Sequence, residues 1–183
     1  MNIYKPFAEL KCDDIEIISQ KFLNIVRDKI ETHQGWIFLN STQLLKEIPE
    51  LLNFFKSNKL YVKHSAATIL QSDFPIHIDV PPTIAKINFP ILNTEGWVNR
   101  WYSIDNEILT NCPKVIDEFG NEKEDISKLP ESDLKLCSEL YNFINPIVFN
   151  SRMGHSVIQL DKKQRPRVVA SFTFINEPLH LLK

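Results

Sequence analysis

The chain between residues 84 and 91 reads IAKINFPI and alternates between apolar and polar side chains. Because side chains alternate between the two faces of a β-strand, this spacing predicts a strand with one apolar face and one face that carries Lys86 and Asn88. The chain contains 11 prolines and 12 phenylalanines but only 4 glycines. This usage favours a strand-rich fold over one built on glycine-rich phosphate-binding loops.

Three further segments, 75–80, 154–160 and 167–174, repeat this pattern of an apolar face and a polar face. The polar faces carry His77 and Asp79 in the first, His155 in the second, and Arg167 and Ser171 in the third. Such faces are either the solvated outside of a sandwich or the lining of a barrel mouth. The second alternative is favoured, because the polar faces carry two imidazoles, a carboxylate and a guanidinium, which are the groups of a binding site.

The whole chain, 1–183, is expected to form one domain in three parts. Residues 1–58 are predicted to be a helical support, with a first helix capped by Asp13 or Asp14 that runs to about Glu31 and a second from Ser41 to Lys56, divided by Pro49. Residues 59–176 form the core, with extended segments at 59–71, 75–80, 84–93, 97–104, 145–150, 154–160 and 166–175. Short connections between them are typical of an antiparallel sandwich or barrel.

Residues 105–135 interrupt the strand pattern with nine acids and four lysines, which predicts a solvated insertion or lid. A short helix is expected near 132–143, where the chain returns to the sheet. The acidity of the insertion favours a cationic peptide or amino-acid substrate.

The composition limits the partners of this chain. Twenty-one Lys and Arg against 23 Asp and Glu give a formal net charge of −2, so no general positive field attracts nucleic acid. The mean hydropathy of −0.18 and the short apolar runs predict a soluble protein without a membrane span. The start lacks a secretory signal, and three cysteines without CxxC spacing predict a cytoplasmic protein. The oligomeric state is left open.

The triplet His77, Asp79 and His155 supplies two imidazoles and one carboxylate. This donor set leaves three adjacent positions open on octahedral Fe(II), where a bidentate oxoacid and dioxygen can bind. The planar guanidinium of Arg167 is suited to hold the distal carboxylate of such an oxoacid, and Ser171 adds a hydroxyl on the same face.

The segments IHID (76–79), KINFPILN (86–93), WY (101–102), GHSV (154–157) and PRVVASF (166–172) resemble Fe(II)/2-oxoglutarate-dependent oxygenases. The resemblance is to small members akin to aspartyl/asparaginyl β-hydroxylases and their phage-type relatives. It implies a double-stranded β-helix (a jelly-roll, cupin-like fold). It also implies Fe(II), 2-oxoglutarate and O2 as cofactor and co-substrates, and hydroxylation of an unactivated C–H bond in an amino acid, a peptide or protein, or a small metabolite.

The same resemblance assigns roles to individual residues. His77, Asp79 and His155 would be the iron ligands, and Arg167 the partner of the C5 carboxylate of 2-oxoglutarate. Lys86 and Asn88 fall where relatives contact co-substrate or substrate. The usual spacing from the distal histidine would select Arg165, whereas the Pro-Arg-x-x-x-Ser context selects Arg167, which we prefer. Several related β-hydroxylases lack the acid that this chain has as Asp79, so the substrate does not transfer.

Several alternatives remain at this point. Tyr61 either packs in the sheet or reaches the oxoacid with its phenol, and Trp97, Trp101 and Tyr102 either fill the core or stack on substrate. A cupin-type metal-binding isomerase or a non-catalytic binding module would use the same fold. A nucleic-acid modifier with the same iron chemistry is disfavoured by the pI of 6.2 and the lack of a basic stripe.

Overall fold

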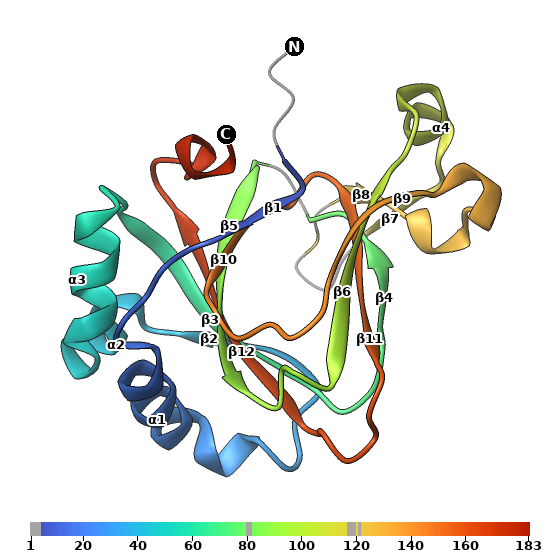
Figure 1. The fold of residues 1–183 in the computed structure, drawn as a ribbon. Coiled ribbons are helices and arrows are strands. Elements are labelled where there is room, and N and C mark those ends of the chain that lie inside the picture. Colours follow the sequence, from blue (N-terminus) through green and yellow to red (C-terminus); the bar gives the residue numbers. More distant parts are fainter. Residues whose placement is uncertain (1–4, 80–81, 117–119, 121) are drawn as a thin grey trace.

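The computed structural model describes residues 5–79, 82–116, 120 and 122–183. Two antiparallel sheets face each other, one of six strands in the order β1-β10-β5-β12-β3-β2 and one of four strands in the order β4-β11-β6-β9 (Figure 1). This arrangement confirms the predicted jelly-roll fold. The large sheet consists of β1 (Phe7–Glu9), β2 (Gly35–Leu39), β3 (Val62–Leu70), β5 (Ala85–Leu92), β10 (Ile147–Asn150) and β12 (Arg167–Phe174). The small sheet consists of β4 (Phe74–His77), β6 (Trp97–Ser103), β9 (Lys135–Leu140) and β11 (Gly154–Gln159).

Helices cover the outer face of the large sheet. They are α1 (Ile15–Val26), continued by the 3-10 turn Arg27–Lys29, then α2 (Ser41–Glu47) and α3 (Pro49–Ser57). Pro49 opens α3 at a position where its missing N–H costs nothing, so it divides the two helices as predicted. Among the described residues, no helix has the length and apolar character that crossing a bilayer requires.

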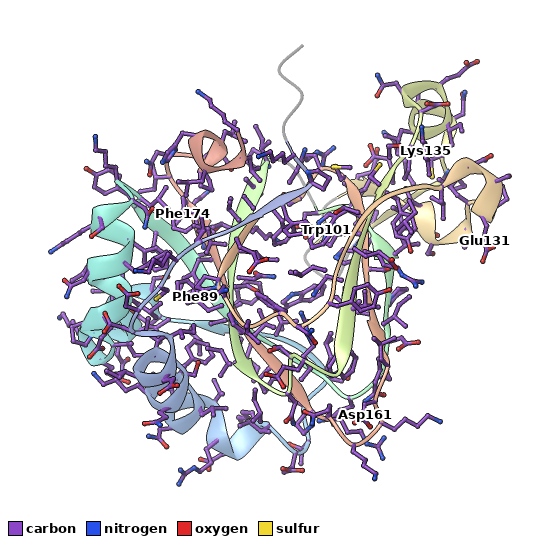
Figure 2. All side chains as sticks on the ribbon, viewed as in Figure 1. Phe89, Trp101, Glu131, Lys135, Asp161 and Phe174 are labelled. Carbon is purple, nitrogen blue, oxygen red and sulfur yellow. The ribbon has the colours of Figure 1, made fainter. Side chains whose placement is uncertain are left out.

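The main hydrophobic core lies between these helices and the large sheet. The apolar stripe of α1, including Phe22, meets Phe55 of α3, Phe89 of β5 and Phe172 of β12, all of which are buried. The rings of Phe55, Phe89 and Phe172 contact one another edge to face, and Figure 2 shows Phe89 on the helix side of the large sheet. Because the apolar faces of the strands supply this core, their polar faces are free to line the space between the sheets.

The N-terminal residues contain two strands that the sequence pattern did not predict. β1 and β2 form the two edges of the large sheet, so residues 1–58 are not wholly helical. β1 has only three residues, and four consecutive apolar residues, 36–39, give β2 no alternation. A strand of either kind carries no period that a sequence pattern could reveal.

The insertion consists of α4 (Asn106–Asn111), the hairpin β7 (Lys114–Ile116) and β8 (Glu122–Glu124), and two 3-10 turns, Ile126–Lys128 and Glu131–Asp133. A further 3-10 turn, Leu179–Leu182, ends the chain. Ile126 and Cys112 pack on Ile76 and Ile78, on the side of that segment opposite His77. Residues 117–119 and 121 of the insertion, and Val80 of the segment predicted at 75–80, lie outside the described residues.

The predicted helix over 132–143 is wrong, because residues 135–140 form β9 at the edge of the small sheet. β9 pairs with β6 in a register that places Glu139 opposite Arg100. Their side chains form an ion pair with 2.7 Å between Arg100 Nε and Glu139 Oε1. Cross-strand pairing of this kind depends on a distant segment, and it overrides the weak local pattern.

Gly96 fixes the close approach of two turns at one end of the sheets. Its carbonyl accepts hydrogen bonds from the N–H groups of Leu160 and Asp161, and a Cβ at this position would collide with Cβ of Gln164 and lie 2.6 Å from its Cγ. We therefore expect Gly96→Ala to lower the free energy of unfolding by about 1–3 kcal/mol, measured by urea denaturation. Gly154→Ala, whose nearest neighbours are flexible isoleucine ends at 3.2 Å, should cost less. An unchanged midpoint for Gly96→Ala would contradict this account.

Candidate metal centre

A pocket opens between the inner faces of the two sheets and contains about 580 Å³ of empty space, solvent at its mouth included. Its walls combine aromatic and aliphatic side chains with a small number of polar ones, which is the usual character of a ligand site. The lining residues come from β2, β3, β5, β10 and β12 of the large sheet and β4, β6 and β11 of the small sheet, with Asp79 from just beyond β4. Figure 2 shows Trp101 between the two sheets.

Strand pairing brings the three predicted metal ligands together. β4 pairs with β11 in a register that places His77 directly opposite His155, and their ring centroids lie 4.1 Å apart. Asp79 follows His77 by two residues and faces the same way. One ligand atom from each of the three side chains lies within 4.8 Å of the others. The backbone of Asp79 is fixed as well, since its N–H donates to Ser151 O at 3.1 Å and its carbonyl accepts from Arg152 Nη1 at 2.6 Å.

Backbone carbonyls set the tautomer of both histidines. His77 Nδ1 donates to Pro75 O at 3.0 Å, and His155 Nδ1 donates to Met153 O at 2.9 Å. Each hydrogen bond leaves Nε2 with a free lone pair, which is how metal-binding histidines are usually oriented. Burial, followed by the neighbouring His155, lowers the pKa of His77 to about 3, and burial also lowers the pKa of His155. Both rings are therefore neutral at pH 7 and able to coordinate a cation.

The two oxygens of Asp79 have different surroundings. Oδ1 lies 2.7 Å from Lys86 Nζ, whereas Oδ2 lies 3.9 Å from His155 Nε2 and is buried without a hydrogen-bond partner among the described residues. Burial alone would raise the pKa of Asp79, but Lys86 and the two imidazoles outweigh it and lower the pKa to about 2. The carboxylate is therefore charged, with one oxygen directed at the histidines, so the three residues fit a divalent cation.

Arg167 lies in the same pocket and has no anionic partner there. It is 2 % exposed, its Nη2 donates to Asn99 Oδ1 at 2.9 Å, and its Nε has no partner among the described residues. Burial lowers the pKa of the guanidinium to about 9, so the group still carries its charge at pH 7. No carboxylate of the described residues forms an ion pair with it. A buried charge without a counter-ion is costly, and this one fits an anionic ligand.

Other orphaned polar atoms gather in the same pocket. Asn88 Oδ1, Asn99 Nδ2 and Trp101 Nε1 are buried and have no hydrogen-bond partner among the described residues. All three residues line the pocket. Since buried polar groups in proteins are normally satisfied, a concentration of unsatisfied ones indicates a place where a polar ligand binds.

The structure also brings most of the other predicted site residues to this pocket. Lys86, Asn88 and Ser171 line it, and the Ser171 hydroxyl lies 3.2 Å from that of Thr68. Arg165, the alternative to Arg167, is exposed and does not line the pocket.

Tyr61 does not reach the site. Its side chain is 68 % exposed, and it precedes β3 at the end remote from Leu70, which pairs with Arg167. The predicted contact between the Tyr61 phenol and the oxoacid is therefore wrong. Trp97 is fully buried and donates to Gln164 O at 2.6 Å, so it belongs to the core, whereas Trp101 lines the pocket.

Sequence reasoning missed Asn99, Ser151 and Arg152. Asn99 lies on β6 and orients Arg167, and the other two fix the backbone of Asp79. Alternation along residues 97–103 would have placed Asn99 on one face with Trp97 and Trp101. No sequence signal points to Ser151 and Arg152, because they act through a turn between β10 and β11.

No protein-family model and no curated protein matches this sequence. Solved structures do match. SnoK, a non-heme alpha-ketoglutarate-dependent carbocyclase from nogalamycin biosynthesis, has a TM-score of 0.55 and 8% identity, covering 93% of this chain and 80% of its own. SnoN, a non-heme alpha-ketoglutarate-dependent epimerase from the same biosynthesis, has a TM-score of 0.53 and 10% identity, covering 94% and 78%.

EvdO2 from Micromonospora carbonacea var. aurantiaca, solved in complex with 2-oxoglutarate, has a TM-score of 0.52 and 13% identity, covering 93% of this chain and 86% of its own. The chain therefore has the fold of these proteins. At such low identity these structures share only their fold with this chain, and the chemistry of the pocket depends on its own residues.

Proposed function

We propose that this chain is a non-haem Fe(II)- and 2-oxoglutarate-dependent dioxygenase that hydroxylates an unactivated C–H bond. The observation that carries the proposal is the pairing, in one pocket, of the His77, Asp79 and His155 cluster with a buried guanidinium that lacks an anionic partner. A divalent metal explains the first group and a carboxylate ligand explains the second. A dicarboxylic oxoacid, with one end on the metal and the other on Arg167, explains both.

In this proposal His77, Asp79 and His155 hold Fe(II) through both Nε2 atoms and Asp79 Oδ2. Arg167 binds the distal carboxylate of 2-oxoglutarate, with Asn99 orienting the guanidinium and the hydroxyls of Ser171 and Thr68 within the same pocket. Bound iron would supply the activation of O2, coupled to oxidation of the co-substrate. A donor set of two histidines and one carboxylate suits iron because it would leave coordination positions for O2 and for the co-substrate.

The apolar lining has a role in the same scheme. Phe74 contacts the His77 ring edge to face at 4.7 Å, and Phe149 contacts the His155 ring at 5.3 Å. These rings limit the rotation of the imidazoles and keep water away from the ligand atoms. Exclusion of water strengthens the interactions of the charged groups inside the pocket.

The proposal extends to the insertion, the substrate and the location of the protein. We place residues 105–135 as a lid or substrate selector of a single domain, since Cys112 and Ile126 of this range pack behind the segment that carries His77 and Asp79. The substrate is an amino acid, a peptide or protein, or a small metabolite, and the cytoplasmic location stays a prediction. The unpartnered Arg167 argues against a cupin-type isomerase or a binding module, which has no need of a carboxylate partner beside the metal.

The proposal is tested by adding Fe(II) and 2-oxoglutarate to the purified chain without oxygen. A weak visible charge-transfer band should appear only when both are present, and His77→Ala should remove it, whereas His180→Ala, at an exposed histidine, should not. Release of succinate on admitting air and a substrate would then report turnover, and the product would distinguish hydroxylation from other outcomes. Absence of both the band and any binding of 2-oxoglutarate would overturn the proposal.

A further inference from the structure

Lys86 adds a positive charge beside the metal ligands that the proposed function does not use. It lies on β5, and its Nζ is bound to Asp79 Oδ1 at 2.7 Å with the side chain 21 % exposed. This is the one ion pair that Lys86 forms among the described residues. A lysine ammonium has three N–H donors, so its capacity for hydrogen bonds exceeds this single contact.

The charges that line the pocket do not balance once its proposed ligands are bound. The charged lining residues are Asp79, Lys86 and Arg167, and together they carry a net single positive charge. A divalent ion raises this to three positive charges, and the two carboxylates of 2-oxoglutarate remove two of them. One positive charge remains in a pocket that is largely buried, where an unbalanced charge is costly.

The acids of the insertion that the structure describes do not supply the missing negative charge. Glu122 pairs with Lys114, and Asp125 pairs with Lys128 at 3.0 Å. No described residue between 105 and 135 lines the pocket. The acids of the insertion that the structure describes therefore do not indicate a cationic substrate, as the sequence suggested, because none of them lines the pocket and two of them are paired with lysines.

We infer that the substrate of this enzyme is an acid, whose carboxylate pairs with Lys86 beside the metal. This inference rests on the proposed function and adds the substrate class to it. A carboxylate in reach of the ammonium would complete the charge balance of the loaded pocket. A neutral substrate would leave the excess charge, and a cationic substrate would increase it.

The experiment uses the chain loaded with Mn(II), which replaces Fe(II) and does not react, and saturated with 2-oxoglutarate. Calorimetry first measures the binding of both. Three probes of similar size, propanoate, propanamide and propylamine, are then titrated, and paramagnetic relaxation of their protons by Mn(II) shows which of them binds near the metal. We expect propanoate to bind about tenfold more tightly than propanamide, as for a charge-assisted hydrogen bond.

Matched variants assign the preference to Lys86. Lys86→Met should abolish it, Lys86→Arg should keep it, and Lys162→Met, at an exposed lysine, should leave it unchanged. Equal binding of the three probes to the wild-type chain, preference for propylamine, no binding of propanoate, or a preference that survives in Lys86→Met would each overturn the inference. Failure of Mn(II) or 2-oxoglutarate to bind in the calorimetry would instead overturn the proposed function itself.

Discussion

Replacing Arg167 with methionine should weaken 2-oxoglutarate binding at least about 100-fold without destabilising the protein. Methionine fills a similar volume but carries no charge, so the ligand loses the buried guanidinium that lines that end of the pocket. Truncating one member of a buried, hydrogen-bonded charge pair typically costs roughly 2–5 kcal/mol of binding free energy. Calorimetry with the Mn(II)-loaded chain measures the loss.

The same substitution should leave the free energy of unfolding unchanged or raise it. Among the described residues, the buried cation Arg167 is held by Asn99 and by the ring of Phe143, whose centroid lies 5.7 Å from the guanidinium carbon. Removing a buried charge that has no counter-ion removes its desolvation cost, which offsets the loss of the hydrogen bond to Asn99. We therefore expect the urea midpoint of Arg167→Met to equal or exceed that of the wild type.

Arg165→Met is the matched control. Arg165 is two residues away and exposed, so its replacement should change neither the binding of 2-oxoglutarate nor the stability. If Arg165→Met weakened binding and Arg167→Met did not, the assignment of the carboxylate partner would be wrong. If Arg167→Met were strongly destabilised, the guanidinium would be a structural group rather than one reserved for a ligand.

The side chains that carry the proposal could be predicted because their strands alternate regularly. His77 and Asp79 lie two residues apart and Arg167 and Ser171 four apart, so each pair shares a face, while Val168 and Ala170 on the opposite face belong to the core. A period of two is local information that the sequence contains. The two histidines meet because β4 pairs with β11 in a register that places them opposite each other.

Other features could not be predicted, because they depend on the length of each strand and on which segments pair at the edges of the two sheets. Tyr61 is adjacent to β3 in the sequence, but the alternation does not reveal that the pocket lies toward the other end of that strand. Asn99 was overlooked because its neighbours on the same face of β6, Trp97 and Trp101, are large aromatic residues that predict a core face. β9 forms a strand because it pairs with β6, and β2 forms a strand because it pairs with β3. These outcomes are decided by tertiary pairing.

Asp79→Ala should abolish metal binding and also lower the stability of the metal-free chain. The metal loses its only carboxylate ligand, so we expect the affinity for Mn(II) to fall by more than about 100-fold, beyond the effect of losing an outer hydrogen bond. At the same time Lys86 loses its counter-ion. Fully buried ion pairs cost roughly 3–5 kcal/mol when one partner is removed, and the partial exposure of Lys86 reduces this to about 2 kcal/mol.

The double variant Asp79→Ala/Lys86→Met separates the two effects. Removing the ammonium as well leaves no uncompensated charge, so the urea midpoint should return toward that of the wild type while metal binding stays lost. Glu131→Ala, at an exposed carboxylate that does not line the pocket, should change neither measurement beyond a few tenths of a kcal/mol. Recovery of metal binding in the double variant would mean that Lys86, and not the loss of a ligand, had blocked the ion. Equal instability of the single and double variants would mean that the ion pair between Asp79 and Lys86 contributes nothing to the metal-free fold.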